Sequence, residues 1–260
     1  MTTFEQQWAQ WHAAHEERRA GRHGFLAITG LHWLTETPQH LPGAPGEWST
    51  GPDGVTVGLG ADEFITIDEK RVTGEHRFGP LPERGDVTVG YGDAVIEVAR
   101  RGGYDVVRPR HPENPTRVKY LGTPAYTPSA DYVVRGRFEP FETPRPTTVG
   151  SVAEGLEHVY ESPGRIHFEL DGKALTLTVF NGGHTGSLFA LFTDATSGIT
   201  TYAANRSLAI DAPDADGTVV LDFNRAVNLP CAYTEFATCP LPPAENRLPV
   251  SIEAGEQLPR

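Results

Sequence analysis

The chain has 260 residues, a net charge of −12 and 38% hydrophobic residues, which allows a sizeable core in one large domain or two smaller ones. An evenly acidic surface repels phosphate backbones and anionic lipids, so we expect no nucleic-acid and no membrane partner. No apolar run approaches the roughly 20 residues of a membrane span. The N-terminus lacks the basic and apolar regions of a signal peptide, and we therefore expect cytoplasmic localisation.

The first predicted element is a helix over residues 3–20. Thr3 and Gln6 fit a capping box, and Gly21 ends the pattern. The large side chains recur at helical spacing: Phe4, Trp8, Trp11 and His15. We favour packing of this face on the core, and the alternative is a partner contact through the tryptophans, as in a homodimer.

The rest of the chain reads as short strands separated by glycine, proline and aspartate, which predicts a mainly β protein built of antiparallel sandwich or barrel units. The predicted strands are 55–59, 64–67, 87–90, 94–98, 104–108, 132–138, 165–170, 174–180, 187–192, 199–203 and 218–223. Asp171-Gly172 predicts a tight hairpin turn. In the strand before it, we expect His167 to face away from the core.

The expected domain organisation follows these changes in composition. We divide the chain into an N-terminal helix (1–24), an N-terminal β unit (25–110), a proline-rich connector (111–146) and a C-terminal β barrel-like unit (147–260). One continuous domain is the alternative. The proline-rich segment after residue 229 mixes apolar and polar residues, so we expect an ordered loop that wraps the protein.

Common catalytic and cofactor motifs are absent from the sequence. There is no Walker A lysine, no dinucleotide-binding glycine pattern, no nucleophile elbow and no zinc-protease motif, so no cofactor is predicted. His12 and His15 lie one helical turn apart with Glu16 beside them. They could bind a metal, but we favour the interpretation that they are exposed helix residues, so no metal site is predicted. Cys231 and Cys239 do not match a redox or zinc pair, and we expect free thiols.

The polar residues gather between 194 and 256. Their pattern is DATSG-x-x-TY from residue 194, Arg206, LDFN-x-A-x-N from 221, PCAY from 230, TCPLPP-x-ENRLP from 238 and I-x-AGE from 252. This pattern resembles the bacterial and archaeal family called domain of unknown function 1684. The resemblance extends more loosely to GLHWL near residue 30 and to Asn114-Pro115. One departure is Leu229 before Pro230, where the family pattern has proline, and the resemblance implies no activity.

Two interpretations of these polar residues remain open. In the first, they pair with each other and with the carbonyls of the proline-rich loop, because proline supplies no N–H donor. In the second, they line a pocket that binds a small polar or anionic molecule. The catalytic candidates are then Asp194, Asp222 and Cys231, although Cys231 is better explained as a packed thiol. The ligand-binding candidates are Arg206, Asn224, Asn228, Tyr233, Asn246 and Arg247.

The function that we favour is binding, or an enzymatic reaction, at such a C-terminal pocket. Arginine binds carboxylate or phosphate through two parallel hydrogen bonds, so Arg206 and Arg247 favour an anionic ligand. The first alternative is a non-catalytic interaction module, because the N-terminal half loosely resembles a forkhead-associated β sandwich at the level of the fold. The second alternative is a metal-dependent hydrolase that uses the scattered histidines and aspartates.

Overall fold

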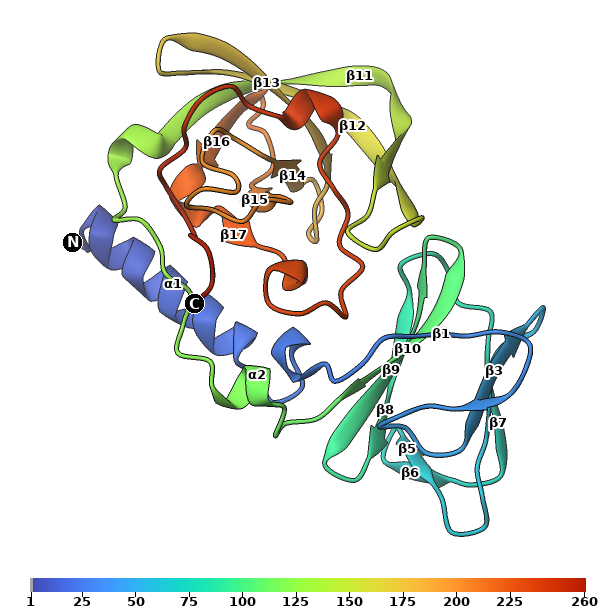
Figure 1. The fold of residues 1–260 in the computed structure, drawn as a ribbon. Helices are drawn as coiled ribbons and strands as arrows, with labels where there is room; N and C mark the ends of the chain where they lie inside the picture. Colours follow the sequence, from blue (N-terminus) through green and yellow to red (C-terminus); the bar gives the residue numbers. More distant parts are fainter. Residues whose placement is uncertain (1) are drawn as a thin grey trace. The chain divides into compact units, whose positions relative to one another are not determined.

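The computed structural model describes residues 2–260 and divides the chain into two compact units (Figure 1). The smaller unit contains Glu17–Tyr120 and Thr234–Thr238. The larger unit contains the residues up to Glu16, Leu121–Tyr233 and Cys239–Arg260. Strands account for 44% of the residues and helices for 14%, so the prediction of a mainly β protein with an N-terminal helix is confirmed.

The N-terminal helix, α1 (Phe4–Arg19), begins at the predicted capping box. The Thr3 backbone N–H donates to Oε1 of Gln6 at 2.9 Å, and the Gln6 backbone N–H donates to the Thr3 hydroxyl at 3.3 Å. Trp8 is half-buried, and its indole N–H donates to the backbone carbonyl of Asn224 at 2.8 Å. This tryptophan therefore contacts the larger unit. Packing of the whole helix face on the core stays a prediction, because Arg19 is the only buried residue of α1.

Two antiparallel sheets build the smaller unit and enclose its apolar core. The six-stranded sheet has the order β1-β10-β9-β8-β5-β6, and the four-stranded sheet has the order β2-β3-β4-β7. The strands are β1 (His32–Trp33), β2 (Gln39–His40), β3 (Glu47–Gly51), β4 (Gly54–Gly58), β5 (Ile65–Ile67), β6 (Lys70–Val72), β7 (Glu75–Gly79), β8 (Asp86–Tyr91), β9 (Ala94–Arg101) and β10 (Tyr104–Arg110). Two short helices complete it: η1 (Phe25–Ala27) and α2 (Pro115–Val118). Trp48, Val57 and Ile96 are fully buried in this core.

One curled, seven-stranded antiparallel sheet builds the larger unit. Its order is β16-β11-β12-β13-β14-β15-β17. The strands are β11 (Val133–Gly150), β12 (Glu157–Leu170), β13 (Lys173–Asn181), β14 (Leu188–Phe192), β15 (Arg206–Ile210), β16 (Thr218–Asp222) and β17 (Val227–Asn228). β15 also lies near β16, but no ladder of hydrogen bonds joins these two strands within the described residues, so the sheet curls without closing. Short 3-10 helices connect its parts: η2 (Ala130–Tyr132), η3 (Phe223–Arg225), η4 (Pro230–Ala232) and η5 (Ala244–Asn246).

β11 is longer than the predicted strand at 132–138 because its prolines lie where they remove few hydrogen bonds. β16 pairs only with Val133–Arg137, so the remainder of β11 has one hydrogen-bonded neighbour, β12. The pairing with β12 shifts between Pro140 and Arg145. Strands tolerate proline at such edges and irregularities because the missing N–H would face no partner there.

The C-terminal segment (residues 239–260) wraps the larger unit, as predicted (red in Figure 1). Alternate side chains enter the core of this unit: Leu248, Val250, Ile252 and Ala254. The residues between them are exposed. This period of two is that of a strand, although the segment belongs to none of the strands that the structure describes.

The hairpin at Asp171-Gly172 is confirmed, since both residues have positive φ angles, +52° and +69°, and β12 pairs with β13 across them. His167 in β12 is exposed while Ile166 and Phe168 are buried, which also confirms the predicted alternation.

The predicted strand at 199–203 is wrong, because this segment forms a turn. The Thr196 carbonyl accepts the backbone N–H groups of Ile199, Thr200 and Thr201, and Gly198 adopts a φ of +81°. The β-branched threonines suggest a strand, but local hydrogen bonds bend the chain here. None of the described helices is long and apolar enough to cross a membrane.

Candidate functional site

The turn that follows β14 forms around the buried carboxylate of Asp194. Oδ1 accepts the Thr196 backbone N–H at 2.8 Å, the Thr196 hydroxyl at 2.6 Å and the Ile252 backbone N–H at 3.3 Å. Oδ2 accepts a hydrogen bond from Nη2 of Arg206 at 2.7 Å. The side chain is 0% exposed, so both carboxylate oxygens bind groups inside the protein.

Arg206 attaches the C-terminal segment to the sheet. Its side chain, on β15, is 1% exposed. Nη1 donates to the carbonyls of Ala254 and Glu256, and Nη2 donates to the carbonyl of Ile252 at 3.0 Å. A ligand could take these donors only if the C-terminal segment moved away from the guanidinium.

Asn246 joins two neighbouring strands from a position outside the sheet. Oδ1 accepts the Thr178 backbone N–H at 2.8 Å, and Nδ2 donates to the carbonyls of Thr178 and Leu191, both at 2.8 Å. The side chain is completely buried. These three bonds link η5 to β13 and β14, so the amide is satisfied within the fold.

Asn224 and Asp222 hold Ser129, at the start of η2, to the end of β16. Asn224 accepts the Ser129 N–H and donates to the Ser129 carbonyl, both at 2.9 Å. Asp222 accepts from the Asn224 side chain at 2.9 Å and pairs with Nε of Arg225 at 3.1 Å. Both candidates therefore have partners within the protein.

Asn228 and Tyr233 meet at the buried carboxylate of Glu256. The Asn228 backbone N–H donates to Oε2 of Glu256 at 2.7 Å, and the Tyr233 hydroxyl lies 3.5 Å from the same oxygen. Asn228 also donates its Nδ2 to the Gln257 carbonyl at 2.8 Å. The sequence patterns did not single out Glu256 as a site residue.

Cys231 and Cys239 are both free thiols, and they lie close together. The Cys231 backbone N–H donates to Sγ of Cys239 at 3.3 Å. Hydrogen bonding with the Cys239 thiol holds the pKa of Cys231 below its ordinary value, although burial opposes this shift. Burial and the neighbouring Cys231 thiol raise the pKa of Tyr202 to about 12, and the Tyr202 hydroxyl donates to the Cys231 carbonyl at 2.8 Å.

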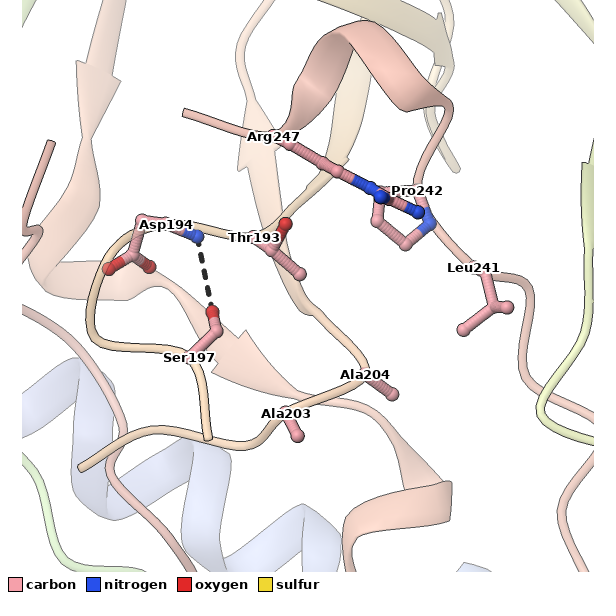
Figure 2. A pocket seen from close by; sticks show the side chains of 8 residues that line it. All are labelled: Thr193, Asp194, Ser197, Ala203, Ala204, Leu241, Pro242 and Arg247. Atoms are coloured by element: carbon pink, nitrogen blue, oxygen red, sulfur yellow. Dashed lines mark hydrogen bonds between the residues drawn. The ribbon is translucent and has the colours of Figure 1, made fainter. Parts of the chain in front are cut away.

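A cavity of about 410 Å³ lies in the larger unit beside Arg247. Its lining residues are Thr193, Asp194, Ser197, Ala203, Ala204, Leu241, Pro242 and Arg247 (Figure 2). Thr193 and Arg247 are held next to each other by a parallel β-bridge. Figure 2 shows the Arg247 side chain extended toward Pro242 and the Asp194 carboxylate directed away from it.

The structure thus separates the candidates of the sequence analysis into different environments. Arg247 and Asp194 line the cavity, whereas the other candidates do not. The remaining lining residues were not singled out as site residues from the sequence. A signal existed for Ser197, because serine three residues after Asp194 is typical of a turn in which a side-chain hydroxyl binds a backbone N–H.

The smaller unit contains its own buried charge cluster, which no pattern in the sequence indicated. Glu97 is 3% exposed and contacts the guanidinium groups of Arg101, Arg108 and Arg110. The forkhead-associated hypothesis needs exposed arginines on loops, and these three lie on β9 and β10 around a carboxylate. That hypothesis stays a prediction.

Comparisons with known proteins place this chain in a family without an assigned activity. The uncharacterized protein from gene locus rrnAC0354 of Haloarcula marismortui, known from a solution NMR structure, is 31% identical, with 54% of this chain and 78% of that chain covered and a TM-score of 0.46. No curated protein matches. The family described as "Protein of unknown function (DUF1684)" matches residues 118–257, more than half of the sequence. This chain belongs to the DUF1684 family.

Proposed function

We propose that the cavity beside Arg247 binds a small organic anion whose carboxylate pairs with the Arg247 guanidinium. The volume of about 410 Å³ falls within the range of roughly 300–1,000 Å³ that is typical of small-molecule sites. The proposal concerns binding and includes no catalytic step. The two aspartates that the sequence suggested as acid–base groups are engaged with Arg206 and Arg225.

The unpaired guanidinium of Arg247 carries the proposal. Arg247 is exposed, and within residues 2–260 its side chain has no acidic partner, although the chain contains 34 acidic residues. Arginine presents a planar set of donors that matches a carboxylate. A guanidinium at a cavity, without an internal carboxylate, is suited to bind a carboxylate that arrives from solution.

Two hydroxyl groups add donors to the same cavity. The Ser197 hydroxyl oxygen accepts the Asp194 backbone N–H at 3.1 Å, so its own O–H can donate to a ligand. The Thr193 hydroxyl has no hydrogen bond to another described residue. Three donors and no accessible carboxylate favour an anion over a cation.

The rest of the lining is apolar and favours an organic ligand over a bare inorganic ion. Leu241 and Pro242 come from the C-terminal segment, and Ala203 and Ala204 come from the chain between the turn and β15 (Figure 2). These side chains would contact a short hydrocarbon body while the carboxylate pairs with Arg247. A mono- or dicarboxylate of a few carbons meets both requirements.

The test is calorimetric titration of the full chain with succinate, glutarate, butyrate and inorganic phosphate. We expect a carboxylate to bind, and Arg247→Gln to weaken this binding at least tenfold, about 1.4 kcal/mol. Arg135→Gln is the matched control, because Arg135 is also exposed but lies on β11 outside the cavity lining. Equal binding by both variants, or no binding of any of the four probes to the unmodified chain, would contradict the proposal.

A further inference from the structure

We propose that His12, Glu16 and Glu256 form a site for one divalent transition-metal ion, with Zn²⁺ as the representative. The ligand atoms of these three residues all lie within 4.8 Å of one another. One imidazole nitrogen and two carboxylate oxygens are a ligand set that suits Zn²⁺. This site is separate from the cavity beside Arg247 and does not depend on it.

The fold places the three ligands from two distant parts of the chain. His12 and Glu16 are four residues apart on α1, so they project from the same face of the helix. Glu256 comes from the extended C-terminal segment. Zinc bonds of about 2.0–2.2 Å require each ligand atom to move inward by less than about 1 Å from the observed positions.

The neighbouring residues hold these side chains in place. The His12 ring stacks on the indole of Trp8, with ring centres 4.7 Å apart and planes 10° apart. The Thr123 backbone N–H donates to Oε2 of Glu16 at 3.0 Å. Such outer contacts orient metal ligands and reduce the entropy lost when the ion binds.

Glu256 is the most deeply buried of the three ligands. It is 1% exposed, and its ligand atom lies within 4.8 Å of those of His12 and Glu16. Carboxylate and imidazole ligand atoms that converge in this way suit a protein-bound Zn²⁺ ion.

His15 offers the competing explanation of this cluster. Its Nε2 lies 3.5 Å from Oε1 of Glu256, so the buried carboxylate already has one contact with α1. The convergence of ligand atoms from His12, Glu16 and Glu256 within 4.8 Å of one another is what favours an ion at this point.

A bound ion would cross-link two parts of the larger unit. It would connect α1 to the C-terminal segment at a point where Asn228 and Tyr233 already contact Glu256. The predicted consequence is a metal-dependent gain in the stability of the larger unit. Three protein ligands also leave one coordination position for water.

The test is calorimetric titration of the full-length, chelator-treated chain with Zn²⁺, with Mg²⁺ as the comparison. We expect one Zn²⁺ per chain and a rise of several degrees in the thermal midpoint. His12→Gln and Glu16→Gln should each weaken Zn²⁺ binding at least tenfold. The glutamine that replaces Glu16 keeps an oxygen for the Thr123 N–H, so this variant should fold even if Glu256→Gln does not.

Two controls separate this site from other places where zinc could bind. His184→Gln removes an exposed histidine on a loop of the same unit and should leave Zn²⁺ affinity unchanged. Co²⁺ in place of Zn²⁺ should show no thiolate charge-transfer band, because neither cysteine is a proposed ligand. The proposal is overturned by the absence of Zn²⁺ binding, by a thiolate band, or by unchanged affinity in the His12 and Glu16 variants.

Discussion

Asp194 and Arg206 form an ion pair that is withdrawn from solvent: Nη2 lies 2.7 Å from Oδ2, and the two side chains are 0% and 1% exposed. The pair joins the turn after β14 to β15, and the same guanidinium binds carbonyls of the C-terminal segment. The C-terminal segment has no strand of its own. The guanidinium of Arg206 therefore attaches it to the sheet.

Removal of the Asp194 charge should therefore destabilise the protein strongly. Asp194→Asn leaves Arg206 buried without its counter-ion, and the loss of one partner of a buried pair typically costs about 3–5 kcal/mol. Urea unfolding followed by tryptophan fluorescence measures this change. Asp211→Asn, at an exposed position, should change the free energy of unfolding by less than about 0.5 kcal/mol. Similar midpoints for the two variants would show that the pair contributes little.

Asn246→Ala tests the amide that joins η5 to the sheet. The substitution removes three hydrogen bonds to the buried backbone of Thr178 and Leu191. Each buried polar group left without a partner costs about 1–3 kcal/mol, so a loss of about 3 kcal/mol is expected. Asn181→Ala, at the exposed end of β13, is the control. Its free energy of unfolding should be close to that of the unmodified chain. A cost below about 1 kcal/mol for Asn246→Ala would mean that water replaces the amide.

Glu97 should make stability depend on pH in the acid range. Burial raises the pKa of this carboxyl, but Arg108 and Arg110 outweigh burial and hold the pKa below its ordinary value. A lowered folded-state pKa contributes stability above the unfolded value of about 4.3, and this contribution is lost as pH falls through the folded value. Glu97→Gln should therefore be less stable than the unmodified chain at neutral pH by about 3–5 kcal/mol.

The pH dependence of this difference is the decisive observation. In urea unfolding between neutral pH and the acid limit of folding, the two proteins should become more similar in stability only below about pH 4. A difference that stays constant over this range would show that the glutamate is not stabilised as the anion.

Cys231 should react as a thiolate at lower pH than an ordinary cysteine. Hydrogen bonding with Cys239 lowers its pKa, and its partial exposure admits a small reagent. The rate of alkylation by iodoacetamide, followed by mass spectrometry, should reach half its maximum below the ordinary thiol pKa of about 8.5. Cys239→Ala should return this midpoint toward the ordinary value. An unchanged midpoint in that variant would assign the shift to another group.

Local patterns in the sequence correctly predicted the elements that neighbouring residues determine. The capping box at Thr3 and Gln6, the hairpin at Asp171-Gly172 and the alternation around His167 depend on residues only a few positions apart. The long polar pattern from residue 194 onward also indicated the family that the comparison confirmed.

The tertiary structure decided which polar residues serve the fold and which face a cavity. Arg206 and Arg247 look equally suited to an anion in the sequence, yet one is buried on Asp194 and the other is exposed at the cavity. The error at 199–203 has a different origin. This segment is a turn whose N–H groups bind the nearby Thr196 carbonyl, so a local pattern was misinterpreted there.

The cluster of His12, Glu16 and Glu256 shows most clearly what local sequence patterns could not predict. The first two residues are close in sequence, but the third lies at the other end of the chain, and the cluster exists only because the C-terminal segment packs beside α1. Periodicity and turn chemistry act over a few residues, whereas burial, ion pairing and metal-ligand geometry depend on contacts that the folded chain alone brings together.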